Sequence, residues 1–350
     1  MGFRQSTKKR IIGIVILSLI LIVIGVLFLV RVPYFVISPG LAQDVSPMVH
    51  VGNIRPHEKG TFMLTTISLK DGNLFDYAYV KLTGKGELVP ENQILAQNES
   101  EEEYQRREAE NMTASQNQAI IAAFRYAKKP VRVEIKGIEV FQLIRKQPQG
   151  LREGDIIRKV DGRPVQSVDQ LIHYLSTKKA GDTVAVGLVR GGKAQTLTLT
   201  LSPLPAEPGE KPRVGLGIIP VPRIKVITSP PAWIEADQIG GPSAGLMFSL
   251  EVLNRLLPED LTHGRRIAGT GTISADGTVG QIGGIQHKLV AAERKHAQIF
   301  FCPEDVMPGD QNEKIAKETI KKEGLHLKLV PVKSLADAVH YLQRLPKATA

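Results

Sequence analysis

The strongest hydrophobic pattern in the sequence is a continuous apolar segment near the N-terminus. Residues 11–30 contain no charged side chain, and Ser18 is their one polar residue. At 1.5 Å per residue, a helix of this length crosses a hydrocarbon core about 30 Å thick. A helix in the core of a soluble domain would normally keep a polar face over such a length. The pattern predicts a transmembrane anchor over residues 11–31, preceded by a tail of residues 1–10.

A cleaved signal peptide is the alternative interpretation of this segment. The apolar part of a signal peptide has about 7–15 residues and ends at a site of small residues, whereas this run is longer and is followed by Arg31 and Pro33. We therefore favour an uncleaved anchor over a trimmed, fully secreted protein. Four basic side chains precede the segment: Arg4, Lys8, Lys9 and Arg10. Because such charges stay in the cytoplasm, we expect a cytoplasmic N-terminus and an extracytoplasmic remainder.

Residues 32–130 carry few signals of chemistry. The β-prone run Thr61–Leu69 predicts a strand, and Asp71-Gly72 after it predicts a turn. Apolar residues at helical spacing predict a helix from Glu99 to about Lys128. We expect this region to be a supporting strand-and-helix element.

Residues 131–202 show the alternation of a β-rich domain. The predicted strands are 131–135, 140–144, 155–160, 184–189 and 197–201, with a short helix over 168–175. The proline-rich stretch 203–213 predicts a linker. A new pattern begins at Val214 and predicts a last domain over residues 214–350.

Composition narrows the classes of function. The 350 residues suffice for two or three domains. A single cysteine, Cys302, excludes a disulfide framework and a cysteine-rich zinc site. The net charge is +10, but the N-terminal tail supplies four of these charges, and aromatic residues are 5% of the chain. Without a basic patch interleaved with aromatics, we expect no nucleic-acid partner.

Residues 150–165 carry a recognisable motif. The segment from Gly150 includes Gly154-Asp155-Ile156-Ile157 and then Asp161-Gly162, and it resembles the central signature of a PDZ domain. PDZ domains add an extended peptide to a sheet edge beside a helix. The resemblance implies a peptide-binding groove between 140–144 and 168–175, with the loop 136–138 near the peptide carboxylate. The implied peptide-binding residues are Gly137, Ile138, Val140, Val168 and Leu171. A structural β-rich spacer without a ligand is the alternative.

A candidate nucleophile lies in residues 239–245, Ile-Gly-Gly-Pro-Ser-Ala-Gly. A run with leucines on one helical face follows, so Ser243 should lie at a helix N-terminus. An N-cap serine is the simplest interpretation. The same position also offers backbone N–H groups and the positive end of a helix dipole to an oxyanion. None of the eight histidines lies in a recognisable catalytic motif, and His-Glu-x-x-His is absent. A serine nucleophile here needs another base.

Residues 277–292 supply a lysine, Lys288. This segment resembles the lysine segment of the Lon protease family, and Gly-Pro-Ser-Ala-Gly resembles the serine segment of that family, 45 residues earlier. The resemblance implies Ser243 as nucleophile, Lys288 as general base and Thr270 as the residue that positions the lysine, supported by Gly240, Gly241, Pro242 and Ala244. Gly241 stands where many Lon proteins have an acid. Burial would lower the pKa of a lysine to roughly 7–8, where it can act as a base. His287 should point away from Lys288 on a helix.

Together these features imply a multidomain α+β protein. It would comprise an N-terminal transmembrane helix, a small α/β region, a PDZ-like β-rich domain and a Lon-type α+β protease domain. The nearest family is that of membrane-anchored, PDZ-containing Lon-like peptidases. Because no Gly-x-x-x-x-Gly-Lys-[Ser/Thr] occurs, we expect an ATP-independent serine endopeptidase without metal or cofactor. It would act on peptides or unfolded segments, and Lon-type domains suggest a homo-oligomer. A non-catalytic peptide-binding scaffold with an inactive protease fold is the alternative.

Overall fold

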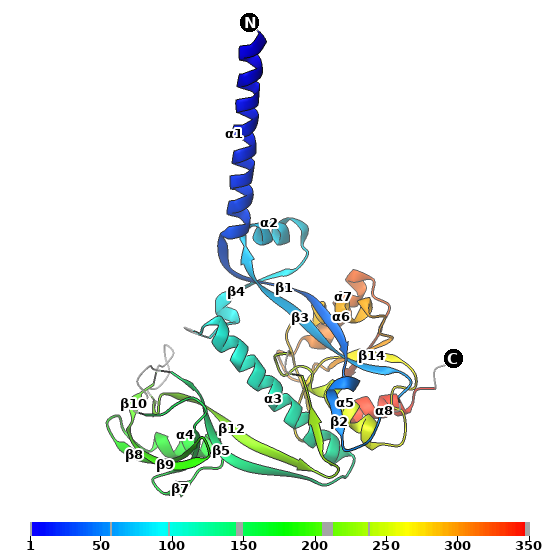
Figure 1. Ribbon diagram of the computed structural model, residues 1–350. Helices are drawn as coiled ribbons and strands as arrows, with labels where there is room; N and C mark the ends of the chain where they lie inside the picture. Colours follow the sequence, from blue (N-terminus) through cyan, green and yellow to red (C-terminus); the bar gives the residue numbers. More distant parts are fainter. Residues whose placement is uncertain are drawn as a thin grey trace. The chain divides into compact units, whose positions relative to one another are not determined.

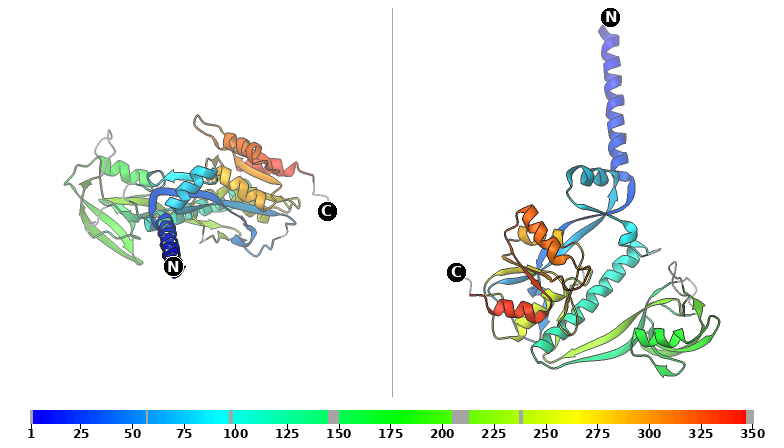
Figure 2. Two further views of the ribbon diagram at one scale, coloured as in Figure 1. Left: turned by 90° about the horizontal axis from the view of Figure 1, so that it is seen from above. Right: turned by 180° about the vertical axis from the view of Figure 1, so that it is seen from behind.

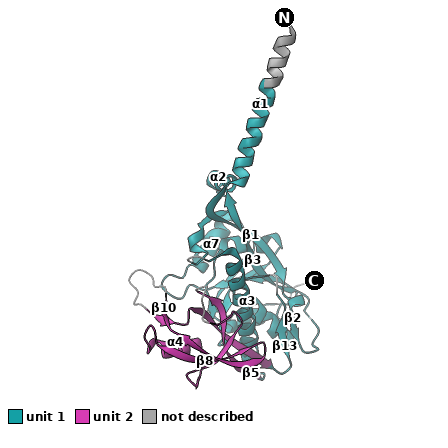
Figure 3. Cartoon of the chain, turned by 60° about the vertical axis from the view of Figure 1, so that its left-hand side comes forward, with its two compact units in different colours: residues 1–130, 228–350 teal, residues 131–227 magenta. Residues whose placement is uncertain are grey.

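A computed structural model describes residues 2–56, 58–96, 99–144, 150–204, 213–236 and 239–346. The chain divides into two compact units (Figure 3). Unit 1 contains the chain up to Pro130 and from Thr228 onward, and unit 2 is the continuous segment Val131–Ile227. Unit 2 is therefore an insertion within unit 1.

The predicted apolar helix is present as α1 (Gly2–Leu29). Its window Ile12–Leu29 is long and apolar enough to cross a membrane, and none of it is buried within the protein. It is followed at once by β1 (Arg31–Asp44), and a short helix, α2 (Leu74–Thr83), lies beside its C-terminal end (Figures 1 and 2).

A six-stranded mixed sheet organises unit 1. Its order is β18-β17-β14-β3-β1-β4. β1 pairs antiparallel with β3 and β4, while the pairs β3–β14, β14–β17 and β17–β18 are parallel. The strands not yet bounded are β3 (Thr61–Asn73), β4 (Glu87–Pro90), β14 (Arg266–Gly269), β17 (Ile299–Pro303) and β18 (Lys328–Val332).

Helices pack on both faces of this sheet. Side chains of α6 (Ile285–Arg294) and α7 (Asn312–Glu323) share one buried cluster with Phe300 and Cys302. Phe301 points to the other face, where its ring meets Tyr341 edge-on. That face carries α3 (Glu101–Tyr126), α5 (Gly245–Leu256) and α8 (Leu335–Gln343), which contact one another.

The remaining short elements of unit 1 are η1 (Ser46–Met48), β2 (Val49–Val51), η2 (Glu91–Gln93), β13 (Ala232–Ile234), β15 (Thr272–Ile273) and β16 (Val279–Gly280).

In its described residues, unit 2 is a β-rich domain with one helix. Its sheet has the order β12-β5-β6-β8-β9, with β7 paired to β6. The elements are β5 (Val131–Leu143), β6 (Ile156–Val160), β7 (Arg163–Pro164), α4 (Val168–Ser176), β8 (Thr183–Arg190), β9 (Lys193–Thr200), β10 (Ser202–Pro203), β11 (Val214–Gly215) and β12 (Ile218–Thr228). Asp155 of the Gly-Asp motif is 1% exposed and forms a bidentate ion pair of 2.7 Å with Arg190, which joins the start of β6 to the end of β8.

The division of the chain differs from the predicted domain boundaries. β1 and β3, from region 32–130, lie inside the sheet that also contains β14 and β17, so this region belongs with residues 228–350. Residues 214–227 lie in unit 2, because β12 pairs with β5. Most of the predicted linker 203–213, residues 205–212, lies outside the described residues. The predicted boundary at Val214 therefore precedes the structural one by about one strand.

Two local features of the structure also differ from the predictions. Asp71-Gly72 lies inside β3 and forms no turn: a Cβ at Gly72 would come within 2.6 Å of the Tyr34 carbonyl oxygen, so the glycine permits close approach of β1. The predicted strands 131–135 and 140–144 are one strand, β5, through Gly137. The predicted helices over 99–128 and 168–175 are confirmed as α3 and α4.

Candidate active site

Ser243 lies in the turn before α5, two residues ahead of the first helical residue, Gly245. The N-cap of α5 is Ala244, and no side chain caps the helix. The N-cap interpretation of Ser243 is therefore wrong, although the serine does lie near the positive end of a helix. Its hydroxyl instead contacts a side chain from α6.

That side chain is Lys288, the predicted base. Its Nζ lies 2.6 Å from Ser243 Oγ and 3.1 Å from Thr270 Oγ1. The lysine is 3% exposed, and burial lowers its pKa to about 7. No carboxylate contributes to this shift, so the amine is neutral in a large fraction of molecules near neutral pH.

Thr270 follows the last residue of β14 and links the two groups. Its side chain is fully buried, and its hydroxyl donates to the Ser243 carbonyl oxygen at 3.1 Å. The adjacent Gly271 N–H donates to the same carbonyl at 2.9 Å. With its proton directed to the backbone, the Thr270 oxygen is free to accept from Lys288. The threonine thus positions both the serine turn and the amine.

The serine turn is held from outside by α3. The Gly241 N–H donates to the Glu108 carbonyl oxygen at 2.8 Å, and Ser115 Oγ donates to the Pro242 carbonyl oxygen at 2.9 Å. Gly241 has a φ of 86°, and a Cβ there would lie 3.0 Å from Glu108 Oε2. At Gly240 a Cβ would meet Glu108 Cβ at 2.9 Å. The glycines are therefore required by the turn and by the approach of α3.

A cavity of about 980 Å³ opens over the Ser243–Lys288 pair. It is lined by residues of β1, β3, α3, the serine turn and the loop before α6, including Thr66, Ile67, Tyr104, Met112 and Ile282. This volume is typical of sites for small molecules or peptide segments. We expected the region 32–130 to be only a support, and it instead supplies two walls of the cavity. Sequence alone carried no signal for this, because β3 and α3 are more than 100 residues away from Ser243.

Beyond its pairing with β14, β3 has an open edge. β14 pairs with Thr61–Leu64 only, whereas β1 pairs along the other edge of β3 as far as Asn73. Residues Thr65–Asp71 line the cavity in part. Among the described strands, none pairs with this part of that edge, so its backbone groups can accept an extended chain.

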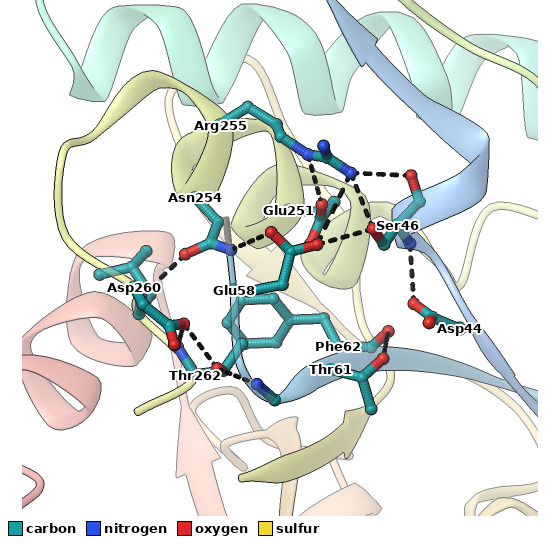
Figure 4. A network of polar contacts seen from close by, with 12 residues as sticks. Asp44, Ser46, Glu58, Thr61, Phe62, Glu251, Asn254, Arg255, Asp260 and Thr262 are labelled. Atoms are coloured by element: carbon teal, nitrogen blue, oxygen red, sulfur yellow. Dashed lines mark hydrogen bonds and ion pairs between the residues drawn. The ribbon is translucent and has the colours of Figure 1, made fainter. Parts of the chain in front are cut away.

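The far end of α5 is fixed by a buried polar network (Figure 4). Arg255 donates to Glu251 Oε1 at 2.7 Å and to the Ser46 carbonyl oxygen at 2.9 Å, and Ser46 Oγ donates to Glu58 Oε1 at 2.6 Å. Burial and the nearby Glu58 carboxylate raise the pKa of Glu251 to about 8. The cluster joins the loop after β1 to the helix that follows Ser243.

His287 takes no part in the pair. Its Nε2 lies 3.2 Å from Glu87 Oε2 on β4, and this contact lowers the pKa of Glu87. The prediction that His287 points away from Lys288 is consistent with these contacts. In the described part of the chain, no three His, Cys, Asp or Glu side chains are grouped to hold a metal ion.

The predicted peptide groove of unit 2 is wrong in detail. Ile138, Val140 and Leu171 are 0–2% exposed and belong to the hydrophobic core, with Val168 packed against it. Gly137 is inside β5, where a Cβ would come within 2.5 Å of the Ile157 carbonyl oxygen. β5 has β12 and β6 as neighbours, so it offers no edge. The edge strand on that side is β12, and its preceding strand β11 contacts α4.

Two family models match the chain. The PDZ domain model matches residues 112–201, and the C-terminal proteolytic domain of Lon protease (S16) matches residues 236–343. The chain combines a PDZ domain with a Lon-type proteolytic domain. No ATPase domain accompanies these matches. Ser243, Thr270 and Lys288 all lie within the Lon-type match.

Two curated relatives and two solved structures each match a short part of the chain. The magnetosome formation protease MamE of Paramagnetospirillum magneticum is 39% identical over 54 residues, and that of Magnetospirillum gryphiswaldense is 37% identical over 54. These matches cover 15% of this chain and 7% of each relative. The PDZ domain of an SdrC-like protein from Listeria monocytogenes is 29% identical, over 26% of this chain and 93% of that one, with a TM-score of 0.23. The PDZ domain of the SdrC-like protein from Listeria innocua is 30% identical. The match covers 23% of this chain and 92% of that one, with a TM-score of 0.20.

Proposed function

We propose that this protein is an ATP-independent, membrane-anchored serine endopeptidase with a Ser243–Lys288 dyad. The proposal rests on one observation above all. A lysine amine with a pKa lowered to about 7 lies 2.6 Å from a serine hydroxyl at the wall of a cavity. A neutral amine can accept the serine proton, and an alkoxide-like oxygen is the required nucleophile.

The chemistry follows from these positions. Neutral Lys288 accepts the proton of Ser243 as Oγ bonds to the carbonyl carbon of the substrate. The resulting ammonium is held by Thr270 Oγ1 and then gives its proton to the leaving amine as the peptide bond breaks. A water molecule next attacks the acyl-serine while Lys288 accepts a proton from it. That proton then passes to Ser243 Oγ as its bond to the acyl carbon breaks and the carboxylic acid product leaves. The start of α5 offers its dipole to the oxyanion of both steps.

The open edge of β3 is where we place the substrate. An extended chain added there would lie along the cavity wall between β3 and α3, near Ser243. Most extended segments of a folded protein are already paired within its own sheets or buried. We therefore expect peptides and unfolded segments to be cleaved without ATP, since the sequence contains no phosphate-binding loop.

We place the catalytic unit outside the cytoplasm, anchored by α1. The four basic residues that precede the apolar segment support this orientation. For unit 2 we propose selection of substrates, or control of their access, through peptide addition at the edge strand β12 beside α4. The support is the sheet order together with the contact of α4 with β11.

Substitution of the dyad tests the proposal. In the full-length protein in detergent, Ser243→Ala and Lys288→Met should each lower cleavage of an unstructured fluorogenic peptide by at least about 10³-fold, because neither group can replace the other. A serine-reactive probe should label the wild type and fail to label Ser243→Ala.

Matched control residues of the same types are available elsewhere in unit 1. Ser274→Ala and Lys295→Ala change an exposed serine and an exposed lysine of unit 1 and should retain wild-type turnover. Circular dichroism should show that all four variants are folded. Wild-type turnover by both dyad variants would refute the assignment, and a wild type that neither cleaves peptides nor reacts with the probe would favour the scaffold alternative.

A further inference from the structure

α2 presents its apolar side chains to the outside. Phe75, Tyr79 and Leu82 are 39%, 42% and 87% exposed, and their spacing places them on one face of the helix. The one residue of α2 that is buried is Asp76, which caps the helix N-terminus together with Asn73. An exposed apolar stripe of this kind calls for a partner.

The stripe is continuous with the end of α1. The ring of Phe28, in the last turn of α1, stacks on Phe75 with centroids 4.7 Å apart, and Phe75 in turn stacks on Tyr79 at 6.1 Å. The Leu74 N–H donates to the Val30 carbonyl oxygen at 3.1 Å. α2 is thus fixed at the level where the apolar segment of α1 ends, as Figures 1 and 2 show.

The charges around α2 suit a lipid surface. Lys81 and Lys85 are exposed, and lysine side chains extend toward headgroups. The nearby carboxylates are paired, Asp76 with Lys70 at 2.9 Å and Asp71 with Arg31 at 3.1 Å. Tyrosine and phenylalanine next to such basic residues match the aromatic belt at membrane interfaces.

We propose that α2 is a second membrane contact, which inserts Phe75, Tyr79 and Leu82 into the boundary between headgroups and acyl chains of the leaflet that α1 leaves. The inference rests on the membrane anchor of the proposed function. An interfacial helix of this kind lies in the plane of the bilayer with its apolar face down.

The contact would set the height of the cavity above the bilayer. β3 runs from the cavity wall at Thr66 directly into Asn73, the N-cap of α2. At about 3.3 Å per residue, the strand from Thr66 to Asn73 spans roughly 20 Å, so a membrane contact at α2 would fix how far this part of the cavity wall lies from the bilayer. A single transmembrane helix would leave this height and tilt unrestrained, whereas two contacts define them.

Tryptophan quenching by brominated lipid tests the proposal. The chain has one tryptophan, Trp233, so Trp233→Phe supplies a background in which Leu82→Trp introduces the single fluorophore. The full-length protein is reconstituted in vesicles of equal parts phosphatidylcholine and phosphatidylglycerol, with or without bromine on the acyl chains. The matched control is Val306→Trp in the same background, because Val306 is another exposed apolar residue of unit 1, at 58%.

We expect the Leu82→Trp protein to show a blue-shifted emission and quenching several-fold greater than that of the Val306→Trp protein. Equal quenching of the two in protein that floats with the vesicles would overturn the interfacial contact. A blue shift without quenching would also overturn it, because a second copy of the chain would then cover the stripe. Protein that does not float would overturn the anchor as well, whereas peptide cleavage in detergent reports on the dyad alone.

Discussion

At the residue scale, the site depends on the protonation state of one amine. Among the described residues, no carboxylate pairs with Lys288, and its polar contacts are two hydroxyl oxygens within 3.1 Å. Hydroxyls accept hydrogen bonds from an ammonium without holding it as firmly as a carboxylate would. Burial therefore decides the pKa of Lys288, and in the proposed mechanism the amine alternates between base and acid.

The pH dependence of cleavage follows from this pKa. The proposed mechanism needs the neutral amine, and the pKa of Lys288 is about 7, so kcat/KM should rise about tenfold per pH unit below that value and level off above it. Initial rates with a non-ionising peptide between pH 5 and 9 would measure the apparent pKa. A flat profile across this range would mean that the base is a different group.

At the element scale, the serine turn is shaped by α3 as much as by its own glycines. Gly241 and Gly84 form a matched pair, because both have positive φ, 86° and 65°, but Gly84 ends α2 in open space. Gly241→Ala should lower peptide cleavage by at least about tenfold through displacement of Ser243. Gly84→Ala should cost similar backbone strain with cleavage unchanged. Equal activity of the two variants would show that the turn tolerates a shift against Glu108.

The buried polar network around Arg255 fixes the other end of α5. Removal of its cation takes the charged partner away from the fully buried Glu251 carboxyl, so Arg255→Met should lower the free energy of unfolding by about 3–5 kcal/mol. Chemical denaturation of the variant measures this loss. Arg266→Met, at an exposed arginine of β14, should change stability by less than about 0.5 kcal/mol. A similar small change at Arg255 would show that the network is dispensable for folding.

At the scale of the whole molecule, unit 2 is an insertion whose two ends meet. The Ser229 N–H donates to the Pro130 carbonyl oxygen at 3.2 Å, so the chain leaves and re-enters unit 1 at nearly one point. Domains inserted in this way can usually be removed without loss of the host fold.

A deletion variant follows from this geometry. Replacement of residues 131–227 by two glycines should leave cleavage of a short unstructured peptide within a few-fold of the wild type, because the dyad and every wall of its cavity lie in unit 1. Preference for peptides with a free terminal carboxylate over their amides should be lost, if unit 2 selects chain ends. The two substrates are compared in direct competition. An unchanged preference would assign the selection to unit 1.

Local signals were sufficient for the parts of the molecule that depend on neighbours in the chain. The apolar segment, the helices α3 and α5, and the glycine turn before Ser243 follow from spacing, capping and turn chemistry over a few residues. The pairing of Ser243 with Lys288 was predicted from two resemblances, and the 2.6 Å contact agrees with it. The prediction of the peptide groove was wrong because apolar residues of β5 and α4 show the same sequence pattern whether they line a groove or fill a core.

The sequence by itself determined where the chain is apolar enough to cross a membrane and which residues are candidates for catalysis. Only the tertiary structure decided that β1 and β3 complete the sheet of unit 1 and that α3 holds the serine turn. The same is true of the burial of the Lys288 amine away from water. The pairing of β3 with β14 and the contacts of α3 with the serine turn join segments more than 100 residues apart in the chain. A pattern within a few residues cannot specify these long-range contacts, because they depend on how the whole chain buries its apolar surface.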